Sequence, residues 1–83
     1  MTLQIILLPQ ALEDLEEVMD PLWTKLMDKI QLLKEFPSLG PPLDGLYLGY
    51  RALTVGIFRV MYRIVSDQAI EVAYVRHCKR DLP

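Results

Sequence analysis

The chain has 83 residues, of which 52% are hydrophobic and 24% are charged. This length indicates one domain, 1–83, with a thin core, and the apolar content excludes intrinsic disorder. The net charge of −2 argues against strong non-specific binding to nucleic acid, and no apolar run approaches the roughly 20 residues of a membrane span.

The first half of the chain is predicted to form one strand and two helices. Residues 3–8 are apolar on both parities, which suits a buried strand, although so short a run could also begin a helix. Pro9 ends that run, and apolar residues then recur at helical spacing over 12–19. Asp20 followed by proline is a strong helix start, so a second helix is predicted over 21–35.

The second half is predicted to form a sheet. Residues 38–45 are a connector rich in glycine and proline, and strand signals follow over 46–55, 57–65 and 69–75. Three consecutive strands with short connections predict an antiparallel meander. The fold class is therefore α+β, in which a strand and a two-helix hairpin precede the meander and the helices cover one sheet face.

Charge is unevenly distributed along the chain. Residues 1–45 carry an excess of acids, whereas 46–83 carry an excess of basic residues. A basic second half points to an anionic partner, either nucleic acid or an acidic protein. The acidic pairs at 13–14 and 16–17 are expected to solvate the first helix rather than to perform acid–base chemistry.

Strand alternation predicts which face each arginine occupies. In the middle strand, Phe58 and Tyr62 share an apolar face that should meet the helices, whereas Arg59 and Arg63 share the open face. Glu71 can pair with Arg63 across the strands. Strict alternation divides the last strand into Ile70, Val72, Tyr74 and Arg76 on one face and Glu71, Ala73, Val75 and His77 on the other.

A basic cluster is predicted near the end of the last strand. A meander places this strand beside the middle one, so Arg59 could meet His77 and Arg80, together with Arg76 or Lys79. Such a cluster suits a phosphate or carboxylate, because arginine donates two N–H groups to an oxyanion and histidine exchanges a proton near neutral pH. The alternative is a solvated basic edge that protects the sheet from aggregation.

The segments RALTVGIFRVMYRI and IEVAYVRHCKRDLP resemble the RelE/ParE superfamily of toxins from type II toxin–antitoxin, or plasmid-stabilisation, modules. The first half also fits, with a strand, ALEDLEEV opening a helical hairpin, and a Pro-Gly connector. The matching residues are Arg51, Leu53, Val55, Gly56, Phe58, Arg59, Val60, Tyr62, Val75, His77 and Arg80.

The resemblance implies two activities of different classes. RelE-like members cut messenger RNA in the ribosome, where fixed cations stabilise the anionic transition state and a tyrosine or histidine transfers a proton. ParE-like members are binding proteins that poison DNA gyrase. A third alternative is an inert interaction module. The implied partners are a cognate antitoxin and either the ribosome with mRNA or DNA gyrase, and a homodimer is also compatible. The expected location is the cytoplasm. No membrane, cofactor or metal is expected.

The resemblance also assigns candidate roles to residues. The candidate catalytic residues are Arg59, His77 and Arg80, and the candidate target-binding residues are Arg51, Tyr62, Arg76 and Lys79. Three departures weaken the nuclease assignment. No tyrosine follows the basic tail, lysines are few, and Phe58 lacks the usual hydroxyl. The motif His-x-x-Arg-Asp-Leu is closer to ParE-like members.

Overall fold

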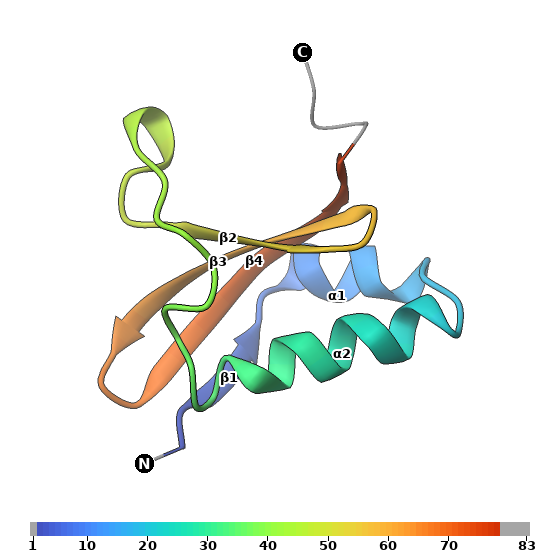
Figure 1. The fold of residues 1–83 in the computed structure, drawn as a ribbon, viewed down its shortest axis with the longest axis horizontal. Coiled ribbons are helices and arrows are strands. Elements are labelled where there is room, and N and C mark those ends of the chain that lie inside the picture. Colours follow the sequence, from blue (N-terminus) through green and yellow to red (C-terminus); the bar gives the residue numbers. More distant parts are fainter. Residues whose placement is uncertain (1, 79–83) are drawn as a thin grey trace.

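The computed structural model describes residues 2–78 of the chain (Figure 1). Its elements in chain order are β1 (Gln4–Leu7), α1 (Pro9–Glu16), α2 (Leu22–Leu32), a 3₁₀ turn (Gly45–Tyr47), β2 (Arg51–Val55), β3 (Phe58–Ser66) and β4 (Ala69–His77). The predicted α+β class and the order of strands and helices are confirmed. None of the helices in this part of the chain is long and apolar enough to cross a membrane.

The four strands form one mixed sheet in the order β1-β4-β3-β2. The predicted antiparallel meander of β2, β3 and β4 is present. The prediction was incomplete, because β1 extends this sheet by pairing in parallel with β4, from Gln4 opposite Ala69 to Leu7 opposite Val72. A parallel neighbour requires a long crossover connection, which the two helices supply.

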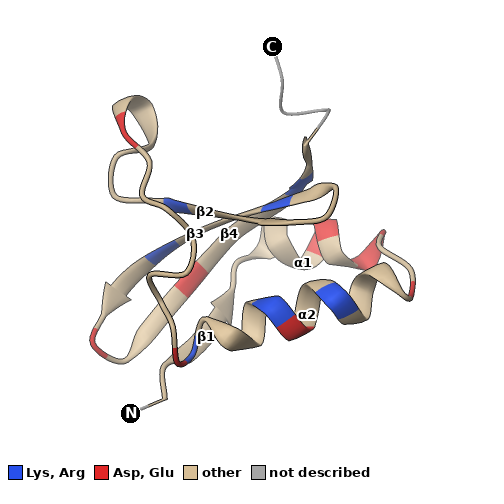
Figure 2. Cartoon of the chain, viewed as in Figure 1, with Lys and Arg blue, Asp and Glu red and all other residues tan. Residues whose placement is uncertain are grey.

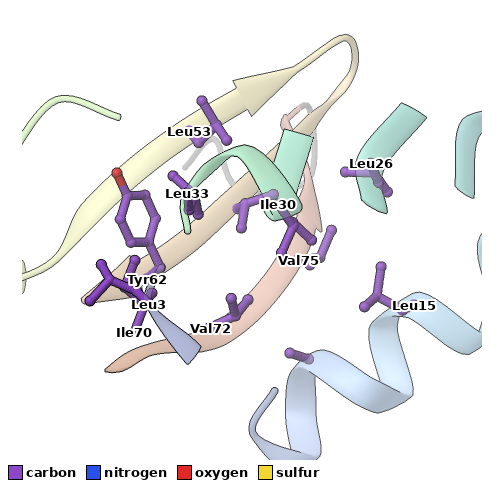
Figure 3. Close-up of a cluster of buried hydrophobic side chains, with 12 residues drawn as sticks. Leu3, Leu15, Leu26, Ile30, Leu33, Leu53, Tyr62, Ile70, Val72 and Val75 are labelled. Carbon is purple, nitrogen blue, oxygen red and sulfur yellow. The ribbon is translucent and has the colours of Figure 1, made fainter. Parts of the chain in front are cut away.

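Both helices cover one face of the sheet (Figure 1), and the core lies between them and the strands (Figure 3). Successive turns of each helix contribute a residue to this core, as their apolar spacing predicts. Its buried members are Leu3, Ala11, Leu15, Leu26, Ile30, Leu33, Leu53, Val60, Tyr62, Ile70, Val72 and Val75. The predicted helix-facing parity of β3 is therefore correct for Val60 and Tyr62, and Phe58 packs against the same cluster.

Two predicted boundaries are wrong. The strand predicted over 46–55 begins only at Arg51, because the preceding residues turn. Gly45 and Gly49 have φ values of 64° and 95°, a left-handed conformation that a strand does not contain. The second helix is also shorter than 21–35, although Asp20 still acts at its start, where its carboxylate accepts hydrogen bonds from the amide and hydroxyl of Thr24.

A β-bulge changes the parity of β4. Met61 lies opposite Tyr74, and the next residue of β3, Tyr62, lies opposite Val72, so Ala73 is left without a partner in the register. The strict alternation predicted for β4 is therefore wrong beyond Val72. Val75 turns to the core with Ile70 and Val72, whereas Tyr74 turns to the open face of the sheet.

The connector between α2 and β2 is fastened to the sheet by the hydroxyl group of Tyr62. This hydroxyl accepts a hydrogen bond of 2.9 Å from the Gly40 amide and donates one of 2.8 Å to the Pro37 carbonyl. Nη1 of Arg51 donates a further bond of 2.8 Å to the Gly40 carbonyl. Tyr62 is fully buried, and this burial raises the pKa of its hydroxyl above the ordinary value of 10.0.

We expect Gly40→Ala to destabilise the fold by about 2 kcal/mol, because an added Cβ overpacks the site. This Cβ would lie 2.7 Å from the Ala52 carbonyl oxygen, which is backbone and cannot rotate away. Gly45→Ala is the control. Its Cβ meets nothing within 4 Å, so only the strain of a left-handed residue, about 1 kcal/mol, is expected. Urea unfolding measures both variants, and equal losses would contradict the close contact at Gly40.

We expect Tyr62→Phe to cost about 1–3 kcal/mol, because it leaves the Gly40 amide and the Pro37 carbonyl without their partner. In the wild type, the unfolded chain ionises Tyr62 near its ordinary pKa of 10.0, and the folded chain only at higher pH. Ionisation therefore favours unfolding, so this contribution is complete below pH 10 and is lost as the pH rises through the folded-state pKa. Unfolding curves between pH 8 and 12 should show a smaller alkaline loss in Tyr62→Phe than in the wild type.

Candidate functional site

Two arginines face each other on the open side of the sheet. Arg59 of β3 lies opposite Arg76 of β4 in the register, and both side chains belong to the face that the helices leave uncovered. The guanidinium carbon of Arg76 lies 4.6 Å from the centre of the Tyr74 ring, a cation–π contact. Like charges directly opposite each other destabilise a sheet, and Asp14 of α1, 3.9 Å from Nε of Arg76, offsets part of this repulsion.

A shallow hollow of about 280 Å³ lies beside Arg59. Its lining combines one cation and one carboxylate with two phenol rings and apolar groups. The lining residues are Leu43, Asp44, Tyr47, Arg59, Met61 and Tyr74. Aromatic faces and an arginine fork together suit recognition of planar and anionic groups, whereas the Asp44 carboxylate opposes a second anion. The hollow forms where the connector meets β3 and β4.

Asp14 of α1 contacts the C-terminal half of β4 along the strand edge that β1 does not reach. β1 pairs with β4 only as far as Val72, so the strand edge beyond that residue needs other acceptors. Oδ2 of Asp14 accepts a hydrogen bond of 2.9 Å from the Val75 amide and lies 3.9 Å from Nε of Arg76. Asp14 thus aligns the strand segment that carries Arg76.

His77 lies on the helix-covered face, opposite Phe58. Their rings meet edge to face with centroids 6.0 Å apart and an interplanar angle of 71°. Neighbouring residues of a strand point to opposite faces, so Arg59 faces away from His77, whereas Arg76 reaches the strand edge and lines the same hollow as His77. The structure therefore does not bring Arg59 and His77 into one site. It brings Arg59 together with Arg76, as the wider predicted cluster allowed.

The other predicted site residues are distributed as follows. Arg51 is half-buried and bonded to the connector, and Tyr62 is fully buried in the core. Both side chains fasten the connector to the sheet, and their predicted role in target binding stays a prediction. Lys79 and Arg80 lie outside the described residues. Arg63 pairs with Glu71 at 3.0 Å, which confirms the predicted cross-strand ion pair.

The two sides of the sheet differ in charge. Figure 2 shows arginines spread along the strands, acidic residues on α1 and residues of both signs on α2. On the helical side, the hollow that contains His77 is lined by Asp14 and Glu17 and also by Arg76. On the open side, the hollow contains Arg59 and Asp44. Acids outnumber arginines in the first hollow and are balanced by Arg59 in the second, so an anionic ligand is repelled less on the open side.

A family comparison now adds to this geometry. The sequence profile described as "ParE toxin of type II toxin-antitoxin system, parDE" matches residues 5–82. The chain belongs to the ParE toxin family. A comparison with curated proteins finds no significant match to the sequence.

Solved structures of toxins share the fold of this ParE-family chain. The RelBE2 toxin–antitoxin complex of Mycobacterium tuberculosis superposes with a TM-score of 0.80 at 21% identity, covering 93% of this chain and 99% of that one. A free RelE mutant of E. coli gives 0.80 at 15% identity, covering 98% and 88%. The chromosomal ParDE system of P. aeruginosa gives 0.73 at 14% identity, covering 92% and 96%. At these identities the likeness shows the fold alone.

The sequence patterns do not single out two residues of this candidate site. They predict a strand at Tyr47, although the glycines at 45 and 49 are a signal for a turn. They place Asp14 among the acids expected only to solvate α1. Its contact with Val75 spans 61 positions of sequence, so no local pattern could have singled it out.

We expect Asp14→Ala to lower the free energy of unfolding by about 1.5–3 kcal/mol, because hydrogen bonds to charged acceptors contribute in this range. The Val75 amide would lose its acceptor at a partly buried position. Glu13→Ala on the exposed face of α1 is the matched control and should change stability by less than about 0.5 kcal/mol. Urea denaturation of both proteins tests this, and indistinguishable curves would contradict a role for Asp14.

Proposed function

We propose that this protein arrests bacterial growth by binding DNA gyrase and not by cutting RNA. Two lines of evidence support this choice. The family profile matches nearly the whole chain as a ParE toxin, and the resemblance of its basic tail motif to ParE-like members points the same way. The arrangement of the site residues supports binding more strongly than catalysis.

The observation that carries the proposal is the separation of Arg59 from His77 by the sheet. Phosphodiester cleavage by general acid–base catalysis needs a proton-transferring group and a cation at the same reacting atoms, within hydrogen-bond reach. The sequence contains a single histidine, and it lies on the opposite face from Arg59. Tyr62, a second candidate for proton transfer, is fully buried, so a nuclease would have to use Tyr47 or Tyr74, the phenols that line the hollow with Arg59.

The open face instead supports recognition of an acidic protein surface. Arg59 and Arg76 lie next to each other across β3 and β4, flanked by the phenol rings of Tyr47 and Tyr74. Arginine and tyrosine are enriched among residues that dominate protein–protein binding energy. A pair of like charges gains most when a partner's carboxylates come between them.

We further propose that an antitoxin holds the protein inactive in the cytoplasm, where both candidate targets are found. Several of the structures with this fold are toxin–antitoxin complexes. A shallow apolar hollow on the helical side supports such a partner, because it can receive an apolar segment. Its lining includes Leu7, Leu12, Leu15, Trp23 and Met27. Co-expression of the neighbouring small reading frame should restore growth.

We expect the purified protein to inhibit DNA supercoiling by gyrase, and Arg59→Ala to weaken this inhibition about tenfold or more, as for a central interface arginine. Lys25→Ala is the control, because Lys25 is an exposed cation on α2, which packs against the other face of the sheet. Inhibition curves against toxin concentration measure both variants.

A parallel assay of ribosome-dependent mRNA cleavage separates the mechanisms. Cleavage that Arg59→Ala abolishes would overturn the gyrase proposal and support a nuclease. If the folded protein causes no mRNA cleavage, no gyrase inhibition and no growth arrest, only the inert interaction module remains.

A further inference from the structure

The segment GLYLG at 45–49 forms a projection that we name the finger. Figure 1 shows it extending from the start of β2, on the side of the sheet away from the helices. Its two leucines are the unusual feature, because Leu46 is 98% exposed and Leu48 is 77% exposed. Tyr47 between them is 50% exposed. Single exposed apolar residues are common, but three in succession at a convex tip are not.

The finger is held in one shape by its backbone. Inside it, the Tyr47 amide donates to the Asp44 carbonyl and the Leu48 amide to the Gly45 carbonyl, both at 3.2 Å. At its base, the Leu43 amide donates to the Tyr50 carbonyl at 2.9 Å. The left-handed glycines at 45 and 49 permit these turns.

The base of the finger is also fastened to the open face. The guanidinium carbon of Arg63 lies 5.5 Å from the centre of the Tyr50 ring, and the Tyr50 amide donates to the Tyr47 carbonyl at 2.9 Å. The backbone that carries the leucines is therefore held in one position, and little backbone entropy remains to be lost on binding.

The exposed leucines do nothing for the stability of the isolated domain, since hydrophobic stabilisation requires removal of apolar surface from water. A convex apolar tip needs a concave apolar site. Tyr47 belongs both to the finger and to the hollow that contains Arg59 and Tyr74. The finger is thus continuous with the arginine pair of the open face.

We propose that the finger inserts into an apolar socket of the target protein whose rim is acidic, with Arg59 and Arg76 meeting the acids of the rim. This inference rests on the proposed function, because it takes the open face to be the target-binding face. It assigns the apolar anchor of that contact to Leu46 and Leu48 and the charged part to the arginines. Apolar anchors surrounded by a polar rim are the usual anatomy of a protein interface.

A second copy of the chain is a poorer occupant. Two fingers meeting tip to tip would bring together three residues from each side, whereas a stable interface takes roughly 20–30 residues a side. A larger contact between two copies in this orientation would place the arginine pairs of both open faces against each other, and like charges in contact oppose association. An acidic partner gains from the same charges.

The test compares the double variant Leu46→Ser/Leu48→Ser with the wild type in two assays, gyrase supercoiling and growth arrest on expression without antitoxin. Met19→Ser is the control, because Met19 is 79% exposed at the far end of the helical hairpin. We expect the double variant to need about 100-fold more protein for equal gyrase inhibition, tenfold for each buried leucine, and to lose growth arrest. Met19→Ser should behave as the wild type, and all three proteins should unfold at similar urea concentrations.

The outcomes separate the finger from the proposed function. If the double variant still inhibits gyrase, the proposed role of the finger is wrong and the gyrase proposal stands. Growth arrest without gyrase inhibition in the wild type, lost in the double variant, would overturn the gyrase proposal and support the finger on another protein target. If the wild type cleaves mRNA on the ribosome and the double variant does not, the finger does not bind a protein socket. If the wild type is not toxic at all, the finger proposal and the gyrase proposal are both wrong.

Discussion

The hydrogen bonds of the Tyr62 hydroxyl are the constraint on which the functional side of the molecule depends. They join the middle of β3 to the connector at Pro37 and Gly40, which are more than 20 positions away in sequence. The connector then leads directly through the finger into β2. Gly40 has no room for a side chain, so the connector approaches the sheet as bare backbone. The position of the finger over the open face follows from this one buried anchor.

The second constraint is the bulge at Ala73, which decides what each sheet face contains. Without it, Val75 would leave the core, and Arg76 would share the face of the buried Val72 and Ile70. With it, β4 keeps an apolar residue under the helices and also places Arg76 opposite Arg59. Asp14 fixes the bulged strand segment from the α1 side. The arginine pair therefore depends on a backbone irregularity and on a distant carboxylate.

Local sequence patterns predict some of these features and not others, for physical reasons. Alternation in β3 predicted that Val60 and Tyr62 are buried, and it paired Arg63 with Glu71, because both depend only on a period of two and on short connections. The same rule was wrong for β4, since a bulge inserts one residue without a clear sequence signal. The sequence predicts a strand at the finger because leucine and tyrosine suit strands. The contacts of Asp14 and of the Tyr62 hydroxyl join distant segments, and no local pattern encodes them.

The two sides of the sheet follow different requirements. Under the helices, the apolar residues are packed, and Tyr62 finds partners for its hydroxyl, as a stable core requires. On the open side, two leucines project into water, an arrangement that does not stabilise an isolated domain. Natural proteins break the rules of stability chiefly at functional sites. Because the leucines and the two arginines lie next to each other around Tyr47, a single binding partner that supplies an apolar socket and carboxylates would contact both.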